Sequence, residues 1–451
     1  MHTTDTDAEL RALVTRPGFR LWKTKVASVH GCAAPVKLRG SSTITHKGTG
    51  EVLKSTVGSV WAPCGTRREA LCPACSQWYA EDAFHLIRAG LDGDTAKGIA
   101  ADVASRPRFF ATLTPPSFGA VHTRVTGPDG RLRRPCSCGE WHREADTRLG
   151  TATDPATYDY EAAVLWQAHA GKLWHRFTIA LRRRLAAAAG MTVTELKDAI
   201  RLSYAKVAEY QRRGLVHFHA AIRLDGPDGP STRPPAWATK EVLADAIRDA
   251  ASAVVLDVAR PGGEVLELRF GSQLDLKDIT TAAAGPGEVG EERDIKSSRL
   301  ASYIAKYATK STGAHEGPDR KLRSGEDIDR LPVSAHHKAM MRTAWDLGGR
   351  EEYAELNLRR WAHMLGFRGH FLSKSRAWST TLGELRNIRA RFRLAETLEA
   401  LGVDEADVLV VNDWEAVAFG HDTDAEREYA QAIAETLLER KLNRDNRKGQ
   451  H

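Results

Sequence analysis

Residues 213–224 read RGLVHFHAAIRL, and their alternation is typical of a β-strand with one fully apolar face. Every second residue from Val216 to Leu224 is apolar, whereas His217, His219 and Arg223 share the opposite face. Two imidazoles therefore leave the same side of one strand. Imidazole is the commonest metal ligand, but a lone His-x-His pair is more often ordinary strand packing. Other segments must decide between these interpretations.

The preceding segment, residues 200–211, also alternates, and only a short turn containing glycine separates it from the histidine strand. The pattern predicts a β-hairpin. We expect Gln211 to pair with His217 and Glu209 with His219, which brings a carboxylate beside both imidazoles. Two histidines and a carboxylate suit Mg²⁺ or Mn²⁺, with zinc as an alternative. A register slip of one residue would turn Glu209 to the other face.

A third segment, residues 297–310, is predicted to form a helix, with serine at its start and glycine shortly after its end. Tyr303, Lys306, Tyr307 and Lys310 have the spacing of one helical stripe. The stripe by itself is compatible with an ordinary amphipathic surface. A phenol has a pKa near 10, so it becomes a good nucleophile only when cations stabilise its phenolate. The two lysines and a metal ion would supply that charge, so we interpret the four residues as catalytic.

The cysteines fall into two groups, of which the first has four members. Cys72 and Cys75 form a C-x-x-C knuckle, and Cys64 and Cys32 precede it. Four thiolates suit a closed, tetrahedral, structural Zn²⁺ site in a segment that is rich in loops, and free thiols are the alternative.

The second group lies in the sequence CSCGEWH, residues 136–142. Cys136, Cys138 and His142 are three possible ligands of a second zinc ion, but the neighbouring sequence contains no obvious fourth ligand. A second structural zinc site and a simple loop are therefore about equally compatible with the pattern.

Charge is distributed unevenly along the 451 residues, whose net charge is +7. Residues 396–440 contain thirteen acidic side chains against two arginines, a net charge of −11, which leaves +18 for the remainder. Such a basic remainder suggests a polyanionic partner, although a solvated basic surface would have the same composition. We find neither a signal peptide pattern nor an apolar run long enough to span a membrane, so we expect a cytoplasmic protein without a membrane partner.

Three segments, in this order, resemble the motifs of the HUH endonucleases, and specifically of two-tyrosine rolling-circle replication initiators. Residues 109–114, FFATLT, resemble a first motif that ends in Leu-Thr. His217-Phe218-His219 resembles the metal-binding second motif, and residues 303–310, YIAKYATK, resemble the third. Residues 158–190 and 204–225 are also similar to RepSA-type initiators of actinobacterial integrative elements and plasmids, a group that has an N-terminal cysteine cluster.

The resemblance implies an α+β fold with a central antiparallel β-sheet and flanking helices, an N-terminal zinc-binding segment and a mainly helical C-terminal region. It implies a metal-dependent DNA endonuclease and strand transferase in which a tyrosine attacks single-stranded or cruciform origin DNA. The products are a 5′-phosphotyrosyl link and a free 3′-hydroxyl. Residues 48–55 imitate a P-loop, but Leu53 replaces its second glycine. We therefore expect a host helicase and host replication proteins as partners.

Four consecutive parts are expected. Residues 1–104 form the N-terminal segment with the cysteine knuckle, residues 105–313 the HUH-type nuclease domain, residues 314–395 a basic region with aromatic residues, and residues 396–451 an acidic helical tail. Two alternatives remain open at this point. A relaxase or transposase would use the same chemistry, and a zinc-containing DNA-binding regulator would use no catalysis at all.

Overall fold

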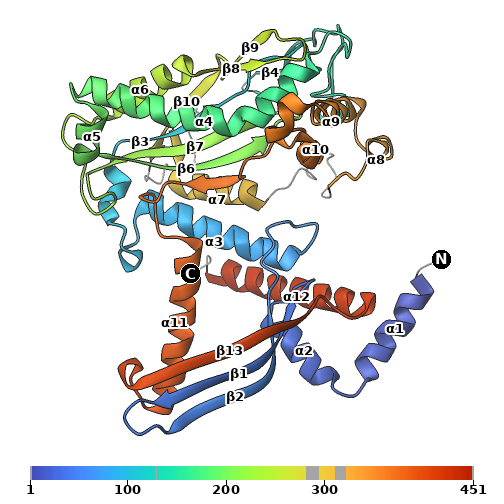
Figure 1. Ribbon diagram of the computed structural model, residues 1–451, viewed down its shortest axis with the longest axis vertical. Coiled ribbons are helices and arrows are strands. Elements are labelled where there is room, and N and C mark those ends of the chain that lie inside the picture. The colour runs from blue at the N-terminus through green and yellow to red at the C-terminus, as the bar shows by residue number, and fades with distance from the viewer. Residues whose placement is uncertain (1–2, 128, 281–293, 310–320, 449–451) are drawn as a thin grey trace. The chain divides into compact units, whose positions relative to one another are not determined.

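The computed structural model describes residues 3–127, 129–280, 294–309 and 321–448 (Figure 1). Its contacts divide the chain into two compact units. The terminal unit combines Met1–Ala83 with Thr381–His451, and the central unit comprises Phe84–Thr380. This division differs from the four consecutive parts expected from the sequence, because the two ends of the chain fold together.

A six-stranded sheet forms the middle of the central unit, with the strand order β11-β10-β3-β7-β6-β12. Neighbouring strands are antiparallel except for β10 and β11, which are parallel. The α+β class with a central, mainly antiparallel sheet is therefore confirmed. The strands are β3 (Arg108–Leu113), β6 (Arg201–Tyr210), β7 (Val216–Asp225), β10 (Leu274–Thr280), β11 (Asp294–Lys296) and β12 (Leu372–Lys374).

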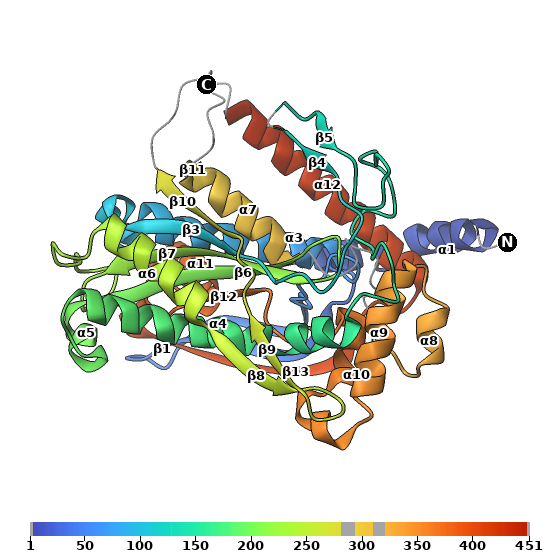
Figure 2. The ribbon, with the colours of Figure 1, turned by 90° about the horizontal axis from the view of Figure 1, so that it is seen from above.

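Helices cover both faces of this sheet (Figure 2). On one face, α4 (Tyr160–Ala188) and α6 (Lys240–Ala253) pack against the apolar side of β7, where Phe218 and Ile222 are fully buried. On the other face lie α7 (Ser297–Thr309) and the second half of α3 (Pro73–Asp92), which pack around Phe110. The alternation predicted for the histidine strand thus determines which side chains face α7.

The hairpin of β6 and β7 is confirmed, but its predicted register is wrong by two residues. Glu209 pairs directly with His217, and Val207 pairs with His219. The turn extends from Gln211 to Leu215, closed by a hydrogen bond of 2.8 Å from the Gln211 amide to the Leu215 carbonyl. Because side chains alternate with a period of two, a shift of two residues keeps Glu209 on the face of the histidines.

Shorter elements complete the central unit. They are β4 (Val125–Thr126), β5 (Leu132–Arg134), β8 (Val255–Ala259), β9 (Val265–Arg269), α5 (Val193–Ala199), α8 (Glu326–Asp329), α9 (Ala335–Leu347) and α10 (Leu358–Trp361). β4 pairs with β5 and β8 with β9, each as a separate two-stranded sheet.

The terminal unit contains a three-stranded sheet in the order β13-β1-β2, made of β1 (Val36–His46), β2 (Val52–Ala62) and β13 (Val408–Phe419). Its helices are α1 (Thr3–Thr15), α2 (Phe19–Ser28), the first half of α3, α11 (Leu382–Leu401) and α12 (Asp424–Lys448). The expected helical tail therefore contains a twelve-residue strand, which its β-branched sequence VLVVNDWEAVAF favours. Within the described ranges, no helix combines the length and the apolar character needed to span a membrane.

Candidate active site

Three candidate metal ligands meet on the α7 side of the central sheet. Glu209 extends from β6, and His217 and His219 extend from β7. The two Nε2 atoms lie 2.9 Å apart, and the Glu209 Oε2 atom lies 3.1 Å from Nε2 of His219 and 3.4 Å from that of His217. Mg²⁺ and Mn²⁺ hold their ligands octahedrally at about 2.1 Å, which separates neighbouring ligand atoms by about 3.0 Å. The triad therefore fits one face of such a metal and leaves its other face to oxygen ligands.

His219 is held in one orientation by its surroundings. Its Nδ1 atom lies 3.0 Å from the Thr112 hydroxyl on β3, and its ring stacks on Phe110 with 5.5 Å between centroids. Burial lowers the pKa of His219, although the hydrogen bond with Glu209 opposes that effect. A neutral imidazole with Nδ1 engaged presents the lone pair of Nε2 to a metal. Thr112 and Phe110 thus fix the orientation of the His219 ring without binding the metal themselves.

Tyr303, on α7, brings a phenol to the same triad. Its hydroxyl donates a hydrogen bond of 2.7 Å to Glu209 Oε2 and lies 2.9 Å from Nε2 of His219. The ring makes edge contacts with Phe110 and with the His219 ring, which fix its direction. Leu300 and Ile304 of the same helix are fully buried and anchor α7 on the sheet. A potential nucleophile therefore lies within one hydrogen bond of two metal ligands.

The other members of the predicted stripe are described only in part. Lys306 lies on the same helix with an exposed side chain. Tyr307 belongs to the last turns of α7, but its side chain lies outside the described part of the chain, as does the whole of Lys310. The structure thus brings Tyr303, Glu209, His217 and His219 together.

A separate cluster in the terminal unit contains Cys32, Cys64, Cys72 and Cys75, whose sulfur atoms all lie within 4.8 Å of one another. Cys32 Sγ lies 3.9 Å from Cys72 Sγ and 3.5 Å from Cys75 Sγ. Zinc–sulfur bonds of about 2.3 Å place tetrahedral ligands about 3.8 Å apart, which agrees with these distances. Hydrogen bonding with the side chains of Cys32 and Cys75 lowers the pKa of Cys72. The four cysteines can therefore bind zinc.

The second cluster of the sequence gains a member that the sequence did not indicate. His122 joins Cys136, Cys138 and His142, and the four ligand atoms lie within 4.8 Å of one another. Burial raises the pKa of the Cys136 thiol, but hydrogen bonds from the backbone amides of Cys138 and Thr123 and from the side chains of Cys138 and His142 together lower it to about 5. His122 escaped sequence analysis because it precedes the cluster by fourteen residues. The only indication in the sequence was that the cluster lacked a fourth ligand, which a histidine upstream could supply.

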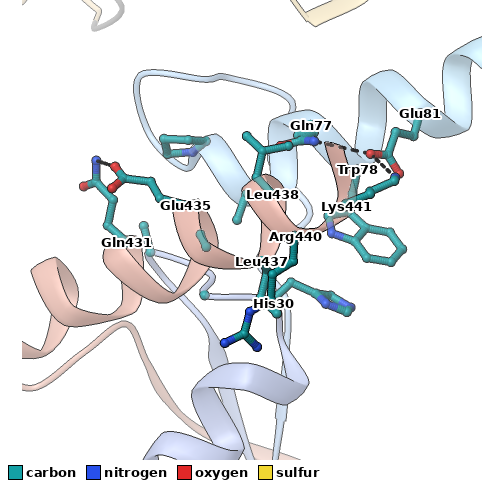
Figure 3. Close-up of a pocket in the computed structure, with 15 residues that line it drawn as sticks. His30, Gln77, Trp78, Glu81, Gln431, Glu435, Leu437, Leu438, Arg440 and Lys441 are labelled. Atoms are coloured by element: carbon teal, nitrogen blue, oxygen red, sulfur yellow. Dashed lines mark hydrogen bonds and ion pairs between the residues drawn. The ribbon is translucent and has the colours of Figure 1, made fainter. Parts of the chain in front are cut away.

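A hollow of about 360 Å³ opens in the terminal unit between α3 and α12 (Figure 3). The Trp78 indole forms one wall and stacks on His30 with 4.1 Å between centroids. Lys441 closes one end through an ion pair of 2.5 Å with Glu81, which also accepts a hydrogen bond from Gln77. None of the candidate catalytic residues belongs to this unit, so the hollow is no part of the triad.

Comparison with known proteins identifies the family. The family model described as "RepSA: Replication initiator protein, pSAM2" matches residues 18–435. A curated "Replication initiator protein" of Streptomyces ambofaciens is 44% identical over 449 residues, which cover 97% of this chain and 94% of that protein. No solved structure matches significantly. The agreement extends across both units, and the chain therefore belongs to the RepSA family of replication initiator proteins.

Proposed function

We propose that this initiator nicks and rejoins single-stranded origin DNA and so starts rolling-circle replication of a plasmid or integrative element. The proposal depends chiefly on one observation, the Tyr303 hydroxyl at 2.7 Å from Glu209 and 2.9 Å from His219. A regulator that only bound DNA would have no need of a phenol beside a possible metal triad. The helix-covered antiparallel sheet that carries the triad agrees with the HUH-type fold that the motifs imply.

Each residue of the triad has a defined role in this mechanism. Glu209, His217 and His219 would hold Mg²⁺ or Mn²⁺, which would polarise the phosphorus and neutralise charge on its oxygens. The Thr112 hydroxyl oxygen accepts a hydrogen bond from the Nδ1–H group of His219, which keeps Nε2 free for the metal. The hydrogen bond to Glu209 directs the Tyr303 oxygen toward the site where the phosphate is held. Lys306 and Lys310 stabilise the phenolate.

The reaction exchanges one phosphoester bond for another. The Tyr303 oxygen forms a bond to phosphorus, the bond from phosphorus to the 3′-oxygen breaks, and the proton of the phenol is balanced by the proton that the 3′-oxygen takes up. The 5′-phosphate remains on the tyrosine, and the 3′-hydroxyl can prime synthesis. Because the covalent link preserves a phosphodiester, rejoining requires no other source of energy.

Tyr307 is the proposed second nucleophile. It follows Tyr303 by four residues, just over one helical turn, so about 6 Å separates the two positions along α7. Both phenols cannot occupy the in-line position behind one phosphorus at once, so they must act in succession. Tyr303 attacks first in this scheme, and Tyr307 attacks the next strand to complete transfer.

The test is incubation of the full chain with a single-stranded origin oligonucleotide and Mn²⁺, followed by denaturing electrophoresis and mapping of the labelled peptide. We expect a covalent adduct on Tyr303. The His217→Ala, His219→Ala double variant should bind the oligonucleotide and form no adduct, because the metal loses two of its three protein ligands. The exposed His175 on α4 provides a matched control, and His175→Ala should retain full adduct formation.

The tyrosines are separated by single and double variants. Tyr303→Phe should lose most first cleavage, Tyr307→Phe should retain cleavage and lose strand transfer, and the double variant should form no adduct. Tyr204→Phe, which changes a phenol on the opposite face of the sheet, is the control. A band shift without covalent labelling under every metal condition would favour the DNA-binding regulator and refute the nuclease. Adduct formation only on a conjugative-transfer or transposon-end sequence would favour the relaxase or transposase.

The remaining partners follow from the same proposal. Origin DNA, single-stranded or extruded as a cruciform, is the substrate, and a host helicase unwinds the duplex ahead of the host replication proteins. The structural cofactor is Zn²⁺ at Cys32, Cys64, Cys72 and Cys75, where it joins segments that are distant in sequence. Metal analysis of the native chain that found no zinc would refute this last part.

A further inference from the structure

The cluster of His122, Cys136, Cys138 and His142 has the geometry of a tetrahedral site. Nδ1 of His122 lies 3.1 Å from Nε2 of His142, which lies 3.3 Å from Cys138 Sγ. Zinc holds nitrogen at about 2.1 Å and sulfur at about 2.3 Å, so tetrahedral ligand atoms are separated by about 3.3–3.8 Å. The observed separations are close to these values. Two sulfurs and two imidazole nitrogens are also a ligand set that zinc prefers.

A second observation is the way in which His142 is held. Its side chain is fully buried, and its Nδ1 atom lies 2.8 Å from Asp146 Oδ2. Arg148 in turn holds Asp146 at 2.9 Å and Glu140 at 2.8 Å. A carboxylate behind a histidine fixes its tautomer and directs the other ring nitrogen, here Nε2, to a metal. In a surface loop without a bound metal, a buried histidine held by a carboxylate would have no structural role.

We propose that His122, Cys136, Cys138 and His142 bind a second structural Zn²⁺ ion, with His122 as the ligand that completes the site. The segment between β3 and α4 supports this assignment, because its described residues form only the short strands β4 and β5. Such a segment buries little apolar surface of its own, and a closed metal site can replace a hydrophobic core.

The site is connected through the backbone to the hairpin that carries the catalytic triad. The His122 amide donates to the Thr151 carbonyl at 2.9 Å, and the Gly150 amide donates to the His122 carbonyl at 2.9 Å. Gly150 packs directly on the turn of the hairpin, since a Cβ atom there would lie 2.5 Å from the Arg212 carbonyl carbon. Arg212 also donates to the Glu144 carbonyl at 3.3 Å. The zinc ion therefore braces the turn between Glu209 and His217.

Zinc stoichiometry of the full chain tests the site without any DNA. The native chain should contain two zinc ions, and Cys138→Ser and His122→Ala should each lower the content to one. Cys72→Ser should also lower it to one, and the double variant of Cys72 and Cys138 should contain none. Ser137→Ala, beside both ligands but not itself one, should retain two.

The result that overturns the site is a native chain with one zinc ion that Cys138→Ser leaves in place and Cys72→Ser removes. Asp146→Asn guards against a variant that simply fails to fold, because it keeps all four ligands. It should retain two zinc ions but release one to a chelator at least tenfold faster than the native chain. Equal release rates would contradict the role assigned to Asp146 and with it the site.

The bracing role depends on the proposed nuclease function and has a separate readout. Gly150→Ala should keep two zinc ions yet slow adduct formation, because its Cβ displaces the turn. Unchanged adduct formation in both Gly150→Ala and Cys138→Ser would refute the brace and leave the zinc site standing. If the native chain formed no adduct at all, the nuclease proposal would fail, and the zinc count would remain decisive for the site.

Discussion

At the scale of single residues, the roles divide between those that touch the reacting groups and those that orient them. Spacing made His217, His219 and Tyr303 candidates, and the order of the three motifs supported them, because their chemistry and their periodicity are both visible in the sequence. Thr112 lies in the first motif, but its contact with His219 was not indicated, since a threonine in a strand is ordinary and this partner is 107 residues away. A residue that orients a ligand cannot be recognised from the neighbouring sequence. It is identified only when the folded sheet shows which side chain it contacts.

We predict that Thr112→Val weakens metal binding at the catalytic triad. The substitution keeps the shape of the side chain and removes the oxygen that lies 3.0 Å from His219 Nδ1. Loss of such an orienting partner typically costs about 10–100-fold in metal affinity or activity. Titration of adduct formation with Mn²⁺ measures the effect. Thr178→Val, whose hydroxyl binds a carbonyl of its own helix, should leave the titration unchanged.

At the scale of elements, patterns of period two and 3.6 predicted the hairpin and the helix that carry the site. The register escaped prediction because pairing depends on where the turn is centred. Its five residues, Gln211 to Leu215, are centred on Arg213, one residue before the centre at Gly214 that the predicted pairing implies. Gly214 has a φ of 75°. Its Cβ position is also occupied by neighbours, since Leu365 Cδ1 would lie 2.8 Å away. The face of Glu209 was predictable, because it survives a shift of two. Its exact partner was not.

The same hairpin contains a lysine that the alternation predicts to face the core. Lys206 lies on the α4 face of β6, only 5% exposed, with its ammonium 4.1 Å from the centre of the Phe218 ring. Burial lowers its pKa to about 7 from the ordinary 10.5. The unfolded chain therefore binds the proton more tightly, so the stability of the fold rises with pH between about 7 and 10.5. Below this window the full cost of the buried charge applies.

We predict that Lys206→Met stabilises the central unit by about 1–3 kcal/mol at pH 7, after subtraction of the attraction between the ammonium and the ring. The advantage should shrink as the pH rises toward 10, because the lysine of the unfolded chain then also loses its proton. Urea unfolding at pH 7 and pH 9.5 provides the comparison. Lys172→Met, on the exposed side of α4, is the control. An advantage that did not change between pH 7 and pH 9.5 would show that the folded lysine keeps its proton over this range, and so that burial does not lower its pKa.

In the whole molecule, the two ends of the chain, which the sequence suggested were separate parts, belong to one compact unit. The acidic composition of residues 396–440 suggested a tail with its own role. In the structure, β13 pairs with β1 along residues 36–46, and α12 supplies Ala430, fully buried beside Trp22 and Val26. Pairings between residues more than 360 positions apart in the sequence leave no trace in local periodicity. The acidic composition of such a segment indicates that its surface is charged, but it does not indicate which strands and helices the segment packs against.

This arrangement predicts that the acidic segment is structural. A chain truncated after residue 407 loses β13 and α12, which leaves an edge of β1 unpaired and removes the contact of 2.9 Å between His421 Nε2 and the Cys32 carbonyl. We expect residues 1–83 to become sensitive to protease and to release their zinc. An independent tail predicts instead that truncation leaves both unchanged.

A matched variant distinguishes the effect of negative charge from the effect of strand pairing. In this variant, Asn replaces Asp413 and Gln replaces Glu415, at exposed positions of β13. This variant keeps the strand, the contact between His421 and Cys32 and the packing of α12, and it removes only two negative charges. If the acidic residues act by masking the basic surface, this variant should bind nonspecific DNA more tightly than the native chain while its zinc content and protease resistance stay unchanged. If their contribution is only to the fold, DNA binding should match that of the native chain. If this variant were as sensitive to protease as the truncated chain, the acidic segment would not act through strand pairing. Its negative charge would then hold the two ends of the chain together.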